Sequence, residues 1–186
     1  MGQRYDALSA PLMAFIAEQK IFFVGTAAAR GHVNVSPKGM ASLKVLGPTR
    51  LLWLNVTGSG NETAAHVLED PRMTVMFCAF EGNPMILRVY GNALAIHPGD
   101  AQWPSLITAF SPLPGARQLF ELDITLVQTS CGMAVPFFDY KEERTQLRDW
   151  AIKKGDAGLR QYWAEKNQVS LDGLPTGIVE TSAPQD

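Results

Sequence analysis

The chain has 186 residues, of which 46% are hydrophobic and 18% are charged, and its formal net charge is −2. This length suits a single domain with a sizeable core, and the composition excludes a chain that is intrinsically disordered. Because nucleic-acid surfaces need clustered Lys and Arg and no basic block is present, we expect no nucleic-acid partner. No apolar run reaches the ~18 residues of a membrane span, and the first ten residues lack a signal-peptide core, so no membrane association is expected.

The cysteines and histidines give no metal or disulfide signature. Cys78 and Cys131 lie far apart without CxxC spacing, and Cys78 lies within an apolar run, so we expect a buried thiol. A reducing, cytoplasmic location fits this pattern. The three histidines, at positions 32, 66 and 97, have no HxxxH or HxH partner, and no metal site is predicted.

A helix and then three strands are predicted in the first third of the chain. Residues 9–19 begin with a serine at a cap position and a proline in the first turn, which is typical of a short helix. The strands are predicted over residues 21–27, 32–38 and 50–57. In the second strand the sequence alternates, so Asn34, Ser36 and Lys38 share one side, which we assign to the face away from the core.

The rest of the chain predicts three more strands and several helices. A short helix over 61–69 precedes two strands around the turn at 81–84, with Gly91 marking a bulge in the second. The excursion over 98–115 is predicted to hold one helix, and a long strand follows it with Phe120, Leu122, Ile124 and Leu126 on one face. Helical segments are predicted over 143–155 and 157–167, and residues 175–186 resemble a disordered tail. This order indicates a mainly β protein with helices, an α+β chain built on an antiparallel barrel.

The stretch "VTGSGNETAAHVL", from Val56 to Leu68, joins a strand to a helix through two glycines. The first N–H groups of the helix lack intrahelical partners and its dipole favours a negative group, so Ser59, Asn61 and Thr63 could complete an anion site. The stretch matches neither a Walker loop nor a GxGxxG turn. The alternative is that Asn61 or Ser59 only caps the helix.

Two cations strengthen the anion interpretation. Lys38 ends its strand before a glycine, where it could neutralise an anion held by the loop, although an ordinary solvated strand face is the alternative. Arg88 interrupts the apolar run "MILRVYG" and needs a partner if it is buried; an outward-facing arginine is the alternative.

The segments "IFFVGTAAARGHVNVSPKG", "RLLWLNVTGSGNETAAHVLEDPRMTVMF" and "ILRVYGNALAI" resemble the pyridoxamine 5′-phosphate oxidase-like family of FMN-binding split barrels. The resemblance covers Leu8 to Ile96 well and the strand near 118–131 loosely. It implies an antiparallel split β-barrel with small crossing helices over residues 1–136, and a helical C-terminal extension with a flexible tail over 137–186. It also implies a homodimer with the flavin site at the interface.

The resemblance implies the following cofactor-binding residues: Val35, Ser36, Lys38, Val56, Thr57, Ser59, Asn61, Thr63 and Arg88. Arg88 does not stand at the family's glutamine position, which Ile86 occupies. The vitamin B6 oxidase itself has Ser-Arg-Lys where this chain has Asn61-Glu62-Thr63, so two cations are lost and the phosphate must depend more on Lys38, hydroxyls and backbone dipoles. We therefore identify the chain as a relative of that oxidase, and not as the oxidase itself.

The implied function is an FMN-dependent oxidoreductase that transfers hydride through flavin N5 to or from a small organic substrate. No residue is assigned a catalytic acid or base role. The alternatives are a flavin- or haem-binding carrier or sensor without turnover, and a reductase that uses the deazaflavin F420.

Overall fold

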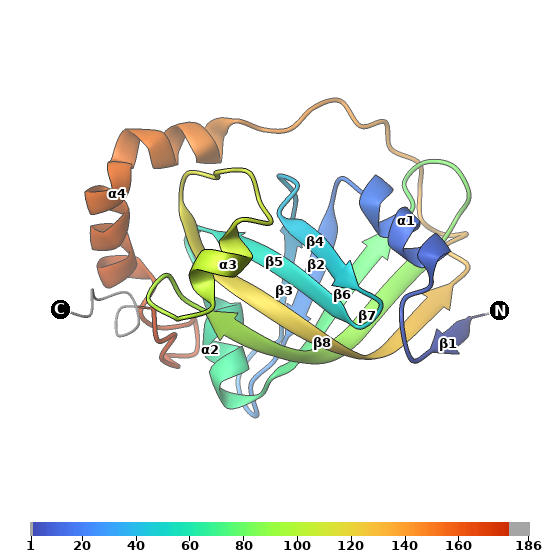
Figure 1. Cartoon of the computed structure of the whole chain (residues 1–186), viewed down its shortest axis with the longest axis horizontal. Helices are drawn as coiled ribbons and strands as arrows, with labels where there is room; N and C mark the ends of the chain where they lie inside the picture. The colour runs from blue at the N-terminus through green and yellow to red at the C-terminus, as the bar shows by residue number, and fades with distance from the viewer. Residues whose placement is uncertain (1, 179–186) are drawn as a thin grey trace.

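The computed structural model describes residues 2–178, which form one eight-stranded antiparallel sheet with helices at its margins (Figure 1). The elements are β1 (Gln3–Tyr5), α1 (Ala10–Glu18), β2 (Phe22–Thr26), β3 (Asn34–Lys38), β4 (Leu43–Gly47), β5 (Arg50–Val56), α2 (Glu62–Glu69), β6 (Arg72–Cys78), β7 (Ile86–Ile96), α3 (Trp103–Ile107), β8 (Ala116–Ser130) and α4 (Gln146–Lys166). The strand order is β3-β2-β6-β7-β8-β5-β4, with β1 added to β8. Because β3 and β4, at the two ends of this order, each pair on one side only and not with each other, the barrel is split, as predicted. None of the helices in residues 2–178 is long and apolar enough to cross a membrane.

Two short edge elements escaped the sequence prediction. β1 has three residues and pairs only with β8, and β4 has five residues and pairs only with β5. Neither shows the long apolar alternation that marks the central strands, because an edge strand contributes less to the core. The predicted strands and the turn between β6 and β7 are confirmed.

The sheet buries side chains on both of its faces along β5. Leu51 and Trp53 belong to the core inside the barrel, where Trp53 stacks on Phe120 with ring centroids 4.9 Å apart. Leu52 and Leu54 point the opposite way, into a second cluster under α3. The continuous apolar run from Leu51 to Leu54 therefore reflects burial on both faces of this strand.

A bulge opposite Gly91 changes which side chains of β8 face the core, so the predicted face is wrong at one position. The register passes from Tyr90–Leu126 to Gly91–Ile124, so one residue of β8 is left over. Phe120, Leu122 and Ile124 lie in the core as predicted, but after the bulge Val127 takes the next core position and Leu126 does not. A one-residue slip turns every following side chain to the other face. Gly91 is required here, because a Cβ would lie 2.0 Å from the backbone oxygen of Asp123.

The orientation of β3 is the reverse of the prediction. Lys38 pairs with Phe22 and Ser36 pairs with Val24, and both β2 partners are core residues. The polar side of β3 therefore faces the inside of the split barrel. Val33 and Val35 are 72% and 65% exposed, on the outer side.

The chain after β8 crosses the molecule without helix or strand over 131–145 and then forms α4 (Figure 1). α4 is broken at Gly155, where φ is 65° and ψ is 169°, so the two predicted helical segments are joined by a kink. Ala151, Leu159 and Trp163 are buried, as their stripe predicts. The predicted disordered tail is wrong for residues 175–178, since Thr176 is fully buried; residues 179–186 lie outside the described part of the chain. The division of the chain at residues 136 and 137 stays a prediction.

Candidate functional site

β3 contacts both β5 and the start of α2 across the inside of the split barrel. At one end the Lys38 Nζ lies 5.0 Å from the centre of the Trp53 ring, and at the other the Asn34 Nδ2 donates to the Thr63 Oγ1 at 3.4 Å. Between these ends, Asn55 Nδ2 donates to Gln118 Oε1 at 3.2 Å. We call this group the polar seam; it consists of Asn34, Ser36, Lys38, Asn55, Asn61, Thr63 and Gln118.

A buried arginine lies beside the polar seam. Arg117 is the extra residue of a bulge in β8, since Asn55 pairs with Gln118 and Val56 with Ala116, and bulges often re-aim a side chain. The residue is 2% exposed, and its Nη1 donates to the Gly60 carbonyl at 3.1 Å and to another amide oxygen at 2.8 Å. In the described residues no carboxylate lies within ion-pairing distance of it. A buried cation of this kind favours an anionic ligand.

Burial perturbs both cations at this site. It lowers the pKa of Arg117 to about 10, so the guanidinium stays charged at neutral pH. Burial, and then repulsion from Arg117, lower the pKa of Lys38 to about 8. The Lys38–Arg117 interaction also shows that the two cations share one region of the molecule. An anion between them would relieve the repulsion and raise both pKa values.

Several buried polar atoms at the site have no hydrogen-bond partner among residues 2–178. They are Ser36 Oγ, both side-chain heteroatoms of Asn61, Arg117 Nε and Gln118 Nε2. Because buried polar groups are almost always paired, this set fits a polar ligand that accepts hydrogen bonds. Asn61 is 2% exposed and stands at the N-cap of α2, yet its side chain makes no capping bond. The capping interpretation is therefore not supported for Asn61.

The structure brings together four of the nine residues predicted to bind the cofactor, namely Ser36, Lys38, Asn61 and Thr63. Thr57 lies behind them, where its Oγ1 donates to the Gly115 carbonyl and accepts from Trp163 Nε1 at 2.8 Å. Ser59 has an exposed side chain on the same loop, and Val56 is half-buried.

Val35 and Arg88 lie away from this group. Val35 is on the outer side of β3, and Arg88 alternates with the core residues Leu87 and Val89, so it too faces outward. Its Nη1 donates to the Ser130 Oγ at 3.1 Å. Within one chain these two residues therefore do not join the polar seam.

The sequence prediction missed Arg117. Its position in "ARQLFELDITL" has the same signature as Arg88, a single arginine in an apolar strand, so the same reasoning could have selected it. What the sequence does not reveal is the bulge that turns this side chain toward the loop.

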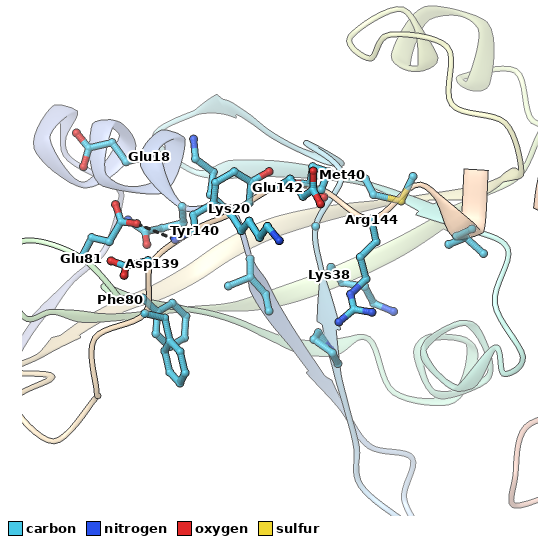
Figure 2. A pocket seen from close by; sticks show the side chains of 18 residues that line it. Glu18, Lys20, Lys38, Met40, Phe80, Glu81, Asp139, Tyr140, Glu142 and Arg144 are labelled. Atoms are coloured by element: carbon cyan, nitrogen blue, oxygen red, sulfur yellow. Dashed lines mark hydrogen bonds between the residues drawn. The ribbon is translucent and has the colours of Figure 1, made fainter. Parts of the chain in front are cut away.

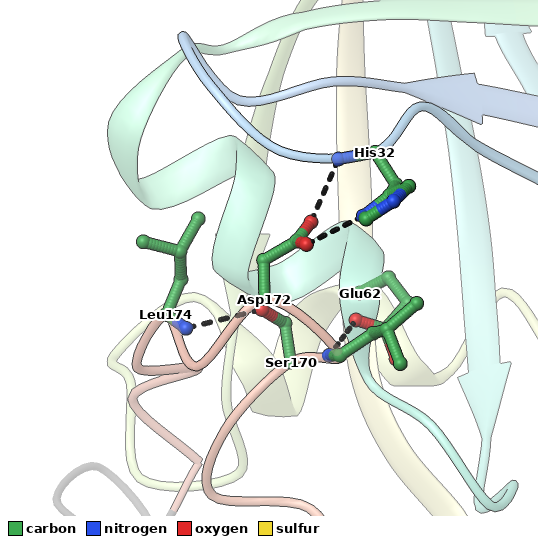
Figure 3. A network of polar contacts seen from close by, with 6 residues as sticks. His32, Glu62, Ser170, Asp172 and Leu174 are labelled. Carbon is green, nitrogen blue, oxygen red and sulfur yellow. Dashed lines mark hydrogen bonds and ion pairs between the residues drawn. The ribbon is translucent and has the colours of Figure 1, made fainter.

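A C-terminal loop over 168–178 covers the start of α2 (Figure 3). Glu62 Oε2 accepts from the Leu171 N–H at 2.8 Å. Asp172 accepts from the His32 N–H at 2.8 Å and pairs with its Nδ1 at 2.6 Å, and these bonds hold the pKa of the Asp172 carboxyl below its usual value. The loop is thereby fastened both to α2 and to the turn that precedes β3.

A cavity of about 740 Å³ opens beside the Lys38 end of the seam (Figure 2). Its walls come from residues 18–21, 37–40, 80–81 and 138–144, together with Leu147. In Figure 2, Lys38 and Arg144 lie toward one side and Phe80 and Glu81 toward the other. Met40 has a positive φ of 61°, an unusual backbone conformation that is often found at functional sites. Lys38 lines this cavity whereas the loop residues Ser59, Asn61 and Thr63 do not, so Lys38 belongs both to the polar seam and to the cavity wall.

Comparison with known proteins places these features in one family. A model of the pyridoxamine 5′-phosphate oxidase family matches residues 8–131. The pyridoxamine 5′-phosphate oxidase family protein ustO of Aspergillus flavus is 36% identical over 191 aligned residues, which cover 92% of this chain and 76% of the relative.

Solved structures share the fold at lower identity. A Lactobacillus delbrueckii protein, provisionally assigned as a pyridoxamine 5′-phosphate oxidase, has a TM-score of 0.53 and 21% identity over 66% of this chain and 94% of that one. A variant of HupZ from group A Streptococcus has a TM-score of 0.53 and 14% identity over 66% of this chain and 98% of that one. At these identities the likeness shows the fold alone.

Proposed function

The chain belongs to the pyridoxamine 5′-phosphate oxidase family, and from this premise we propose that it is an FMN-dependent oxidoreductase acting on a small organic substrate. The proposal has three parts: the cofactor phosphate binds at the polar seam, the substrate binds in the cavity beside Lys38, and a second copy of the chain covers the outer face of β3.

The observation that carries the proposal is the buried Arg117. Arg117 is 2% exposed and forms no ion pair within the described residues, although the Glu62 carboxylate interacts with it from farther away, so its burial is costly unless a closer anion neutralises it. The unpartnered side chain of Asn61 and the first N–H groups of α2 lie next to Gly60, whose carbonyl Arg117 contacts. Together they form a set of donors that suits a phosphate. Arg117 thus replaces the cations that the loop itself lacks.

The residues of the chain bind and orient the cofactor. Arg117, Asn61 and Thr63 would hold its phosphate, and Lys38 would lie between the phosphate and the cavity. Bound FMN supplies hydride-transfer chemistry, and the protein supplies position and electric field. In the cofactor-free chain the Lys38 ammonium can hold or release a proton near neutral pH, because its pKa is about 8, and a bound phosphate would favour its charged form.

The cavity beside Lys38 is large enough for a small organic substrate. Its volume of about 740 Å³ lies within the ~300–1,000 Å³ usual for ligand sites. Aromatic and aliphatic side chains such as Phe80, Tyr140 and Ile21 form its apolar surface, and Lys20 lies 6.0 Å from the Tyr140 ring. This lining suits a partly apolar ligand with a charged group.

The outer face of β3 is the surface that a partner chain would cover. Val33 and Val35 are exposed there, and the register continues this face across β2 to Arg88 and Tyr90 of β7. Exposed contiguous apolar surface marks sites of protein association. Because Val35 and Arg88 lie on this outer face, they would contribute to a flavin site only by contacting the cofactor bound to the other copy of the chain.

The experiment that tests the proposal identifies the cofactor that co-purifies with the chain. Absorbance and mass spectrometry of the released cofactor distinguish FMN from F420 and haem, and an NAD(P)H oxidation assay with the loaded protein tests turnover. Bound FMN with reduction by a nicotinamide would support the proposal. Bound cofactor without turnover would favour a carrier or sensor, and absence of any flavin would reject the cofactor assignment.

A further inference from the structure

We propose that the C-terminal helix completes the phosphate end of the site, with Asn167 positioning Arg117 and the 57–60 loop, so that phosphate binding and docking of α4 are coupled. This inference rests on the proposed function and adds a residue to it from outside the stretch, 8–131, that the family model matches.

Asn167 makes three hydrogen bonds that link separate parts of the site. Its Oδ1 accepts from Arg117 Nη1 at 2.8 Å, and its Nδ2 donates to the carbonyls of Gly58 at 3.1 Å and Ser59 at 3.3 Å. The residue is fully buried. Both ends of one amide are therefore used, one to aim the guanidinium and the other to fix the loop carbonyls. No other standard side chain of this size both accepts and donates in this way.

Asn167 is itself held by its neighbours. Its N–H donates to the Trp163 carbonyl at 3.0 Å, and its carbonyl accepts from the Thr176 Oγ1 at 2.6 Å. Trp163 adds a second link to the loop, through the bond from its Nε1 to Thr57. The last turn of α4 and the segment after it thus form one connected network with the loop.

The coupling follows because the hydrogen bond between Arg117 and Asn167 belongs both to the phosphate site and to the contact of α4 with the loop. The Arg117 Nη1 is held by two acceptors, the Gly60 carbonyl of the loop and the Asn167 Oδ1, and the second is in place only while α4 is docked. A phosphate that binds Arg117 therefore stabilises the docked helix, and the docked helix strengthens phosphate binding by the same factor. The part of the cofactor without a phosphate takes no part in this coupling.

The test compares FMN with riboflavin, which has the same ring without the phosphate. Asn167→Asp places a carboxylate beside the Arg117 guanidinium, where it competes with the phosphate, and beside the two loop carbonyls, which lose their hydrogen-bond donor. FMN affinity should therefore fall about tenfold or more, while riboflavin affinity stays within about twofold. Gln161→Glu, which adds the same charge on the exposed side of α4, should change neither affinity. An unchanged ratio of FMN to riboflavin affinity in Asn167→Asp would overturn the inference, and so would an equal loss of both ligands.

Two further measurements distinguish the coupling from misfolding of Asn167→Asp. Trp163→Phe keeps the packing but removes the bond to Thr57, and it should lower FMN affinity severalfold without affecting riboflavin. In hydrogen exchange, FMN should slow the amides of residues 163–171 in the unmodified chain but not in Asn167→Asp.

If the chain binds no flavin, inorganic phosphate serves as the probe. It should raise the melting temperature of the unmodified chain and of Gln161→Glu, but not of Asn167→Asp. A phosphate effect that survives in Asn167→Asp would reject the coupling whatever the cofactor is.

Discussion

Replacing Arg117 by Met removes the buried guanidinium and keeps a side chain of similar length. The proposed phosphate loses its only fully buried cation among the described residues. A hydrogen bond to a charged group contributes about 1.5–3 kcal/mol, so FMN should bind about 10- to 150-fold more weakly. Riboflavin, which has no phosphate, should bind with unchanged affinity.

The same substitution should change the stability of the cofactor-free protein only slightly. It removes the bonds from Arg117 to the carbonyl of Gly60 and to the amide oxygen of Asn167. It also removes the cost of burying an unneutralised charge, which is several kcal/mol. These two effects oppose each other, so we expect a net change within about 2 kcal/mol of zero. In a chain of this size each 1 kcal/mol moves the melting temperature by about 2–4 °C.

Fluorescence titration with both flavins and calorimetry of the cofactor-free protein provide the two readouts. Arg160→Met, which removes an exposed arginine of α4, is the matched control and should leave both readouts unchanged. A drop in melting temperature of more than about 10 °C with an unchanged preference for FMN would show that Arg117 braces the loop and does not bind the cofactor.

The structure supports four other predictions. Because the pKa of Lys38 is about 8, FMN affinity should weaken as the pH rises through that value in a titration from pH 6.5 to 9.5. Lys38→Met should bind FMN severalfold more weakly at pH 7 and should lose this pH dependence. In the cofactor-free protein the pKa of Lys38 is about 8, whereas its ordinary value is 10.5, so between these two pH values the folded chain binds fewer protons at Lys38 than the unfolded chain does. The contribution of Lys38 to the free energy of unfolding should therefore rise with pH across this window, as measured in urea melts. Gly91→Ala should destabilise the fold by about 3 kcal/mol or more in urea melts, because the new Cβ would lie 2.0 Å from a backbone oxygen. Gly47→Ala is the control and should be nearly neutral, because its Cβ would have no neighbour within 4 Å. Val35→Glu should shift a dimer toward monomer in light scattering while the exposed control Ile152→Glu does not; equal masses for both variants would place the interface elsewhere.

Periodicity predicted the central part of this fold for a physical reason. β5, β6, β7 and β8 carry most of the core, so their apolar runs are long and their turns are marked by Gly, Pro and Asn. The glycine at position 91 was predictable as a bulge because an isolated Gly in a strand usually marks one. The position of Leu126 was not, because the sequence does not show on which strand the extra residue falls.

The candidate site was only partly predictable, because its residues come from separate elements. The loop and Lys38 have local signals, a helix start and a strand end. Arg117 depends on a bulge in β8, and Asn167 follows a helix 50 residues later in the chain, so only the packed structure brings them together. Polar residues that act through one another have no characteristic spacing in sequence.

β3 shows why hydrophobic patterning assigned the wrong face. The usual rule places the apolar side of an alternating strand in the core, since burying one valine contributes about 1.5–3 kcal/mol relative to leaving it exposed. Here the polar side faces inward, beside Arg117 and Asn61, and Val33 and Val35 face outward. The proposed ligand and the proposed second chain would each offset one of these costs. A bound anion would satisfy the inner side, and a second chain would bury the outer one. The reversed strand therefore links the cofactor proposal to the dimer proposal: if Val35→Glu yields a monomer, that monomer should also bind FMN more weakly, although the substitution touches no residue of the polar seam.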